Sequence, residues 1–214
     1  KVSASLVSVM VAMPLLFAPF RALVGFRSDH HRSELGWRRV PFLWMGTMLQ
    51  FGGFAIMPFA LLVLAGMGQS GNAPLWVGHL ACALAFLLVG AGLHTVQTAG
   101  LALATDLSTP DKMPRVVGFL YVMMLVGMIG SAIAFGDVLT HFSPGRLIQV
   151  IQGAAILTLV LNVVAMWKQE ARSRHRKPSA QSGQPDPDFS QAWHCFLQGP
   201  NALRHLLILG LGTM

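Results

Sequence analysis

Charged residues are scarce in this chain, and their scarcity excludes an ordinary water-soluble fold. Asp, Glu, Lys and Arg make up 11% of the 214 residues, whereas a soluble domain carries about 25%. So few charges do not cover the surface of a globular domain in water. Intrinsic disorder is excluded as well, because disordered chains are poor in apolar residues and 54% of this sequence is hydrophobic.

Cysteines and soluble-enzyme motifs are also scarce. Cys82 and Cys195 give neither a disulfide framework nor a metal-ligand spacing. The sequence contains no phosphate-cradling glycine loop and no nucleophile elbow. We therefore expect neither an enzyme nor a metal site built from protein ligands. The formal net charge of +7 does not indicate a nucleic-acid partner, because the basic residues lie between apolar runs.

Long apolar runs dominate the sequence instead. Five of them reach the length of about 20 residues that a helix needs to cross the hydrocarbon core of a bilayer. We expect them to be helical, because backbone groups in lipid have no water partners. The fold class predicted is an all-α integral membrane protein. The predicted spans are residues 2–24, 40–67, 76–105, 116–136 and 147–167, and a sixth run begins near Leu203.

Basic residues are distributed unevenly between the connections. The first, third and fifth connections, residues 27–39, 106–115 and 168–177, hold eleven Lys and Arg. The second and fourth, residues 68–74 and 137–146, hold one. Basic residues concentrate in cytoplasmic loops, so we predict that the odd-numbered connections face the cytoplasm.

The chain divides by composition into a membrane part and a polar part. Residues 1–167 are predicted to form an N-terminal transmembrane half, and residues 168–202 a cytoplasmic central linker. Within the linker, residues 178–188 are rich in Ser, Gln, Pro and Asp. Residues 189–197 are expected to form a short interfacial helix with aromatic side chains on one face. Residues 203–214 would begin a C-terminal half, since many transporter folds consist of paired repeats.

Both chain ends suggest an internal fragment of a longer membrane protein. The sequence lacks an initiating Met and stops inside an apolar stretch. The first apolar run is too long for a signal peptide, contains Pro14 and Pro19, and leads to Arg21 instead of a cleavage site.

The first connection carries a patterned set of small and charged residues. Its order resembles the loop between the second and third helices of the major facilitator superfamily, where Gly-x-x-x-Asp-Arg-x-Gly-Arg-Arg is usual. The spacing after Asp29 is stretched here. A merely topogenic charged loop is the alternative interpretation. The residues concerned are Gly25, Asp29, Arg32, Gly36, Arg38 and Arg39.

A closer resemblance covers residues 2 to about 168. Segments 15–22, 36–41, 90–95, 97–106 and 146–154 resemble the PucC/LhaA family of phototrophic bacteria. The resemblance implies the first half of a major-facilitator-like bundle, from the second to the seventh of roughly twelve spans. It also implies help in assembling light-harvesting complexes in the intracytoplasmic photosynthetic membrane, with bacteriochlorophyll as cargo or ligand. Implied partners are the antenna polypeptides and, further, the reaction-centre complex or pigment-synthesis enzymes.

Polar residues in the third span are the candidate pigment site. Gly90, His94, Gln97 and Thr98 share one helical face, and polar groups in a span usually face the bundle interior. A neutral imidazole suits the axial position of a chlorin magnesium, so we hypothesise that His94 touches pigment and that Gln97 donates to a ring carbonyl. The alternative is an interhelical hydrogen bond with no ligand.

Other intramembrane polar residues are candidates for a shared cavity. Gln149 and Gln152 are expected to form a polar patch on the fifth span, with Asn162 about a quarter turn off it. Arg21, near the cytoplasmic end of the first span, is expected either to snorkel or to pair with Asp29 or Asp106. The candidate cavity residues are Gln50, Thr98, Gln149 and Gln152.

Two other functions remain open. A secondary transporter of a small solute would use the same fold, but the carboxylates of the five runs lie at their ends, which disfavours proton coupling. A structural scaffold within an antenna complex would show tight helix contacts without pigment in the bundle.

Overall fold

The computed structural model describes residues 4–31, 37–66, 74–141, 143–167, 169, 189–199, 201–202 and 204. Within these ranges the chain is helical and contains no strand. It divides into two compact units, Lys1–Ser173 and Arg174–Met214. Three predictions lie outside the described residues: Arg32 and Gly36 of the loop motif, the linker 178–188, and nearly all of the run that begins near Leu203.

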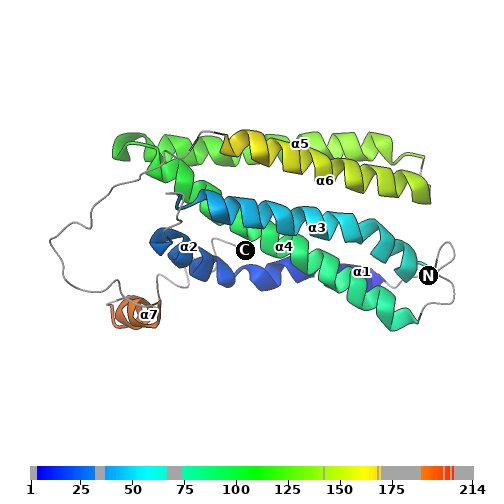
Figure 1. The fold of residues 1–214 in the computed structure, drawn as a ribbon, viewed down its shortest axis with the longest axis horizontal. Coiled ribbons are helices and arrows are strands. Elements are labelled where there is room, and N and C mark those ends of the chain that lie inside the picture. The colour runs from blue at the N-terminus through cyan, green and yellow to red at the C-terminus, as the bar shows by residue number, and fades with distance from the viewer. Residues whose placement is uncertain are drawn as a thin grey trace. The chain divides into compact units, whose positions relative to one another are not determined.

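The first unit contains the membrane spans that the sequence predicts. Five helical segments of the described chain are long and apolar enough to cross a bilayer, which confirms the all-α membrane fold. The first segment consists of three consecutive pieces, the segment Pro110–Val138 of a short 3₁₀ helix and an α-helix, and the other three are single helices (Figure 1). The elements are α1 (Ala4–Ala12), η1 (Met13–Phe17), α2 (Phe20–His30), α3 (Val40–Leu64), α4 (Leu75–Asp106), η3 (Pro110–Lys112), α5 (Met113–Val138) and α6 (Pro144–Met166).

Prolines and caps define where the long helices begin. Pro41, Pro114 and Pro144 each lie in the first turn of a helix, where the missing N–H costs no hydrogen bond. Ser143 caps α6 by accepting a hydrogen bond from the Arg146 backbone N–H at 3.1 Å. Helices α3 to α6 begin and end within a few residues of the predicted bounds.

The first span differs from its prediction. The run 2–24 was expected to be one helix, but α1 ends at Ala12, a 3₁₀ turn follows over Met13–Phe17, and α2 runs from Phe20 to His30. Pro14 and Pro19 explain the break, because each removes a backbone donor and its ring clashes with the preceding turn. The span also extends beyond its apolar part, to His30.

Helix α4 contacts more elements of the first unit than any other helix described. The pieces of the first span line one side of it, and α3 packs along another side (Figure 1). The α3–α4 contact is close enough to require glycine: a Cβ on Gly53 would lie 2.8 Å from the Ala85 carbonyl oxygen, and one on Gly92 would lie 2.5 Å from the Gly46 oxygen. Small residues permit this approach, which drives helix association in lipid.

Helices α5 and α6 pack against the rest of the first unit to different extents. Helix α6 packs on α3, where the Asn162 amide donates to Thr47 Oγ1 at 3.1 Å. Asn162 was expected off the polar patch, and this contact across the spans was not foreseen. Helix α5 has no buried residue, so nearly all of its apolar surface is exposed in the described chain.

The second unit contains one described helix, α7, which runs from Phe189 to Leu197. These are the residues for which the sequence predicts a short helix. None of its residues is buried.

Two adjacent glycines of α3 give a matched test of the α3–α4 contact. A Cβ at Gly53 meets Ala85 O and Val89 N below 3.0 Å, whereas a Cβ at Gly52 meets nothing within 4 Å. We expect Gly53→Ala to lower the free energy of unfolding by about 1–3 kcal/mol through overpacking. Gly52→Ala should be neutral or stabilising by up to about 1 kcal/mol, because alanine is the better helix former. Thermal unfolding of the full-length protein in detergent measures both, and equal effects would contradict the packing described.

Candidate functional site

The break in the first span lies directly against α4. A Cβ on Gly90 would come within 2.5 Å of Pro14 Cα, so only glycine allows the 3₁₀ turn to approach this closely. One turn along α4, His94 Nε2 lies 3.1 Å from the Pro14 carbonyl oxygen. Because a carbonyl only accepts, Nε2 is the donor. The imidazole thus adds a side-chain donor from α4 to a backbone carbonyl of the broken span.

Thr98 extends this seam by a further turn. Its hydroxyl donates to the His94 backbone oxygen at 2.7 Å and accepts from Arg21 Nε at 3.3 Å. The structure therefore gives Arg21 a partner that the sequence did not suggest. The residues that line the contact between the first span and α4, called the seam from here on, are Pro14, Arg21, Gly90, His94 and Thr98.

The seam can be tested for its fit to a chlorin. His94 is the right type of ligand for magnesium, but Nε2 is engaged with Pro14 O. Nδ1 is buried and has no hydrogen-bond partner among the described residues. Because Nε2 carries the proton, Nδ1 has the ring's lone pair, and ligation through it requires the seam to open around this buried atom. Nε2 makes the interhelical hydrogen bond of the alternative interpretation. Pigment contact by His94 and by the half-buried Gln97 stays a prediction.

The four candidate cavity residues lie in different places. Gln50 is 5% exposed and packs against Gly92 between α3 and α4, while Thr98 belongs to the seam. Gln149 is exposed and Gln152 is half-buried on α6. Asn162 contacts Thr47, and Gln152 lies ten residues, about 15 Å of helix rise, from Asn162 along α6. Among the described residues, Gln50 makes no hydrogen bond to Gln149 or Gln152.

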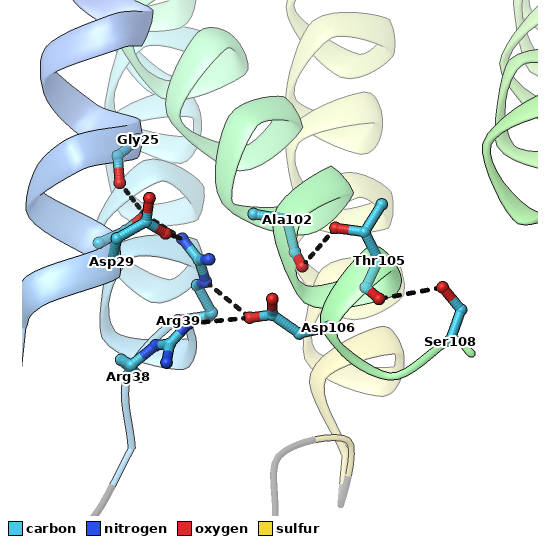
Figure 2. Close-up of polar contacts among 9 residues, drawn as sticks. Gly25, Asp29, Arg38, Arg39, Ala102, Thr105, Asp106 and Ser108 are labelled. Carbon is cyan, nitrogen blue, oxygen red and sulfur yellow. Dashed lines mark hydrogen bonds and ion pairs between the residues drawn. The ribbon is translucent and has the colours of Figure 1, made fainter. Parts of the chain in front are cut away.

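A second polar cluster ties three helix ends together. Arg39 is 5% exposed, pairs with Asp29, and lies 3.2 Å from Asp106 Oδ2 through Nε. Its Nη1 donates to Ser28 Oγ at 2.6 Å, and that hydroxyl donates to Gly25 O at 2.8 Å. Figure 2 shows the Arg39 guanidinium between the two carboxylates. Arg38 adds a more exposed contact to Asp106 at 3.2 Å. We call this set the Arg39 cluster.

Helix dipoles explain why the Arg39 cluster is needed. Asp29 lies in the last turn of α2 and Asp106 is the last residue of α4, so both anions lie at the negative end of a helix. Arg39 is the N-cap of α3, so the cation lies at a positive end. Each charge is unfavourable for its own helix. Pairing them across helices removes the penalty and fixes the three ends at one side of the bundle.

Sequence reasoning identified only part of these sites. It named Gly25, Asp29, Arg38 and Arg39 from the loop motif, but not Ser28, and it left Asp106 as one of two possible partners of Arg21. The contact with Asp106 could have been predicted, because consecutive spans run in opposite directions. The end of the first span, the start of the second and the end of the third must therefore lie on the same side of the bundle. Charges of opposite sign at those three points predict a contact.

The fold and the seam define a multi-span α-helical membrane protein with a broken first helix. A model of the PUCC protein family matches residues 1–214. Protein PucC of Rhodovulum sulfidophilum is 59% identical over 214 residues, which is all of this chain and 47% of that protein. Protein PucC of Rhodobacter capsulatus is 59% identical over 212 residues, 99% of this chain and 46% of that protein. The chain belongs to the PucC family.

A more distant relative and the lack of a structural match complete the comparison. The Bacteriochlorophyll synthase 44.5 kDa chain of Rhodobacter capsulatus is 26% identical over 148 residues, 69% of this chain and 33% of that protein. The chain spans about half the length of the curated PucC relatives it matches. No solved structure matches it, so the major-facilitator-like arrangement stays a prediction.

The two arginines that begin α3 give a test of the Arg39 cluster. Arg39 is nearly buried between two acids, whereas the Arg38 side chain is 46% exposed. We expect Arg39→Ala to lower the free energy of unfolding by about 2–3 kcal/mol, because charged hydrogen bonds are lost. Arg38→Ala should cost less than about 1 kcal/mol.

Thermal unfolding of the full-length protein measures both changes. A double-mutant cycle with Asp106→Asn should show stronger coupling to Arg39 than to Arg38. Equal destabilisation by the two alanine variants would remove Arg39 from the centre of the cluster.

Proposed function

We propose that the full-length protein assists the assembly of photosynthetic light-harvesting complexes. The observation that carries this proposal is the family match over residues 1–214, with 59% identity to PucC proteins of two bacteria. The more distant relative is named for bacteriochlorophyll synthesis, and its similarity supports a role of this chain close to that pigment. The setting proposed is the intracytoplasmic photosynthetic membrane of a bacterium, with the odd-numbered connections in the cytoplasm.

The mechanism proposed is non-covalent positioning of pigment and polypeptide. Within the described spans, carboxylates lie at helix ends, as Asp29, Asp106 and Asp137 do. The seam offers hydrogen-bonding groups instead of a nucleophile with an activating base. A protein of this kind holds a molecule in place while another is inserted, and it needs no bond to form or break.

The pigment site proposed within this mechanism is the seam. His94 Nδ1 is a buried polar atom without a partner in the described chain, and a buried polar atom of this kind is costly in a membrane. The bond from His94 to Pro14 joins helix α4 to a 3₁₀ turn, which has weaker hydrogen-bond geometry than an α-helix. Because Nε2 carries the proton, Nδ1 has the ring's lone pair, and opening of the seam around it would let it ligate a chlorin magnesium, with Gln97 on the next turn.

The partners proposed are single-span antenna polypeptides, with the reaction-centre complex and pigment-synthesis enzymes as further candidates. In this view the Arg39 cluster keeps the cytoplasmic ends of α2, α3 and α4 fixed while the seam exchanges contacts. A rigid frame of this kind would position a newly inserted helix relative to its pigment.

A secondary transporter of a small solute is the second candidate. The observation that favours it is the broken first span, because discontinuous helices surround the substrates of many transporters. The position of the carboxylates at helix ends argues against proton coupling by this part of the protein.

Deletion and complementation in a phototrophic bacterium test the assembly role. We expect deletion of the full-length gene to remove most of the light-harvesting absorption while the reaction-centre absorption remains. The reintroduced gene should restore the antenna bands. Normal antenna absorption in the deletion strain would contradict an assembly role.

Two substitutions of His94 separate pigment ligation from a structural role. His94→Gln keeps an N–H donor for Pro14 O but removes the imidazole ligand, whereas His94→Leu removes both. We expect chlorin to copurify with the wild-type full-length protein and to be lost from His94→Leu, which has no group that can ligate magnesium. The glutamine variant should retain more thermal stability than the leucine variant, and its amide oxygen can itself ligate magnesium. Chlorin that remains at the wild-type ratio in His94→Leu would assign His94 a structural role only.

A further inference from the structure

Helix α7 has two sharply different faces. With 3.6 residues per turn, its apolar side chains gather on one side and its polar side chains on the other, and the two sets do not mix. The polar face carries no acidic residue. The apolar face consists of Phe189, Ala192, Trp193, Phe196 and Leu197, and the polar face of Ser190, Gln191, His194 and Cys195.

The aromatic rings of α7 form a continuous surface. The ring centroids of Phe189 and Trp193 are 6.2 Å apart with an interplanar angle of 16°, and those of Trp193 and Phe196 are 5.8 Å apart at 26°. Trp193 and Phe196 are nevertheless 39% and 38% exposed. Stacking along the helix therefore orders the rings without covering them, and a contiguous apolar surface of this kind indicates an interaction site.

A helix this short needs a surface to stabilise it. Isolated helices below about 12–15 residues are marginal in water, and α7 has nine residues, none of them buried. An apolar surface that covers the aromatic face would provide the missing free energy.

Charge and chain connectivity favour lipid over a protein as that surface. Residues 168–177, upstream of α7, hold five Lys and Arg but one acid, which suits anionic headgroups. Downstream, the apolar run that begins near Leu203 follows α7 after five residues. This short tether raises the local concentration of membrane around the helix. Tryptophan is also enriched at membrane interfaces.

We propose that α7 lies in the plane of the membrane interface, with its aromatic face among the upper acyl chains and its polar face in water. The lipid is an anionic phospholipid surface, and the insertion depth is about 5–10 Å. The helix then anchors the polar connection after α6 to the same membrane that the spans cross. This inference stands on α7 alone and is independent of the assembly role.

Native cysteines make the proposal directly measurable. Cys195 lies on the polar face of α7 and is exposed, whereas Cys82 is buried in the first unit. Two single-cysteine forms of the full-length protein are compared, in a background that carries Cys82→Ala and in which any cysteine outside residues 1–214 is replaced as well. One keeps Cys195, and the other carries Cys195→Ser with Ala192→Cys on the apolar face. Each is spin-labelled in phosphatidylcholine vesicles with phosphatidylglycerol, and the label's accessibility to oxygen and to a nickel chelate is measured.

The proposal expects opposite accessibilities at the two positions. The label at position 192 should be reached by oxygen, which dissolves in lipid, and shielded from the nickel chelate. The label at Cys195 should be reached by the nickel chelate. Nickel access at both positions would overturn the proposal in favour of an aqueous helix. Shielding of position 192 from both reagents would overturn it in favour of a protein contact.

Discussion

A backbone group inside a bilayer must find its hydrogen-bond partner within the protein, and this constraint organises the first unit. Pro14 interrupts the first span, and its carbonyl accepts a hydrogen bond from His94 of α4. Gly90 permits the approach, and Thr98 continues the contact to Arg21. The same side of α4 therefore accommodates the break and donates a hydrogen bond to it. His94, which the sequence suggests as a pigment ligand, donates a hydrogen bond that links α4 to the first span.

The Arg39 cluster and the α3–α4 glycines complete this frame from two other directions. Asp29 and Asp106 lie at helix ends that disfavour anions, and Arg39 holds both. Gly53 and Gly92 bring the backbones of α3 and α4 into contact. The Arg39 cluster thus fixes the ends of α2, α3 and α4 by charge. Close packing of glycines fixes the middle of α3 against α4. Helix α6 packs on α3 of this frame, whereas α5 depends little on it, since none of its residues is buried.

The spans were predictable from the sequence because length and apolarity alone decide whether a helix crosses a bilayer. The family resemblance was carried by long unusual segments and is confirmed by the family match. The break at Met13–Phe17 was not foreseen although Pro14 was visible, because a proline either kinks or interrupts a helix according to the partners its neighbours provide. The contacts of Asn162 with Thr47, and of Arg39 with Asp106, depend on the register between helices far apart in sequence. Periodicity within one helix does not contain that register.

The protonation state of the His94 ring tests the central claim most directly. The full-length protein, labelled with ¹⁵N in histidine and ¹³C in proline and reconstituted in lipid, is suited to solid-state nuclear magnetic resonance. The account predicts a neutral ring protonated at Nε2, with a through-space correlation between that nitrogen and the Pro14 carbonyl carbon. A ring protonated at Nδ1, or the absence of that correlation, would contradict the claim that α4 closes the break in the first span.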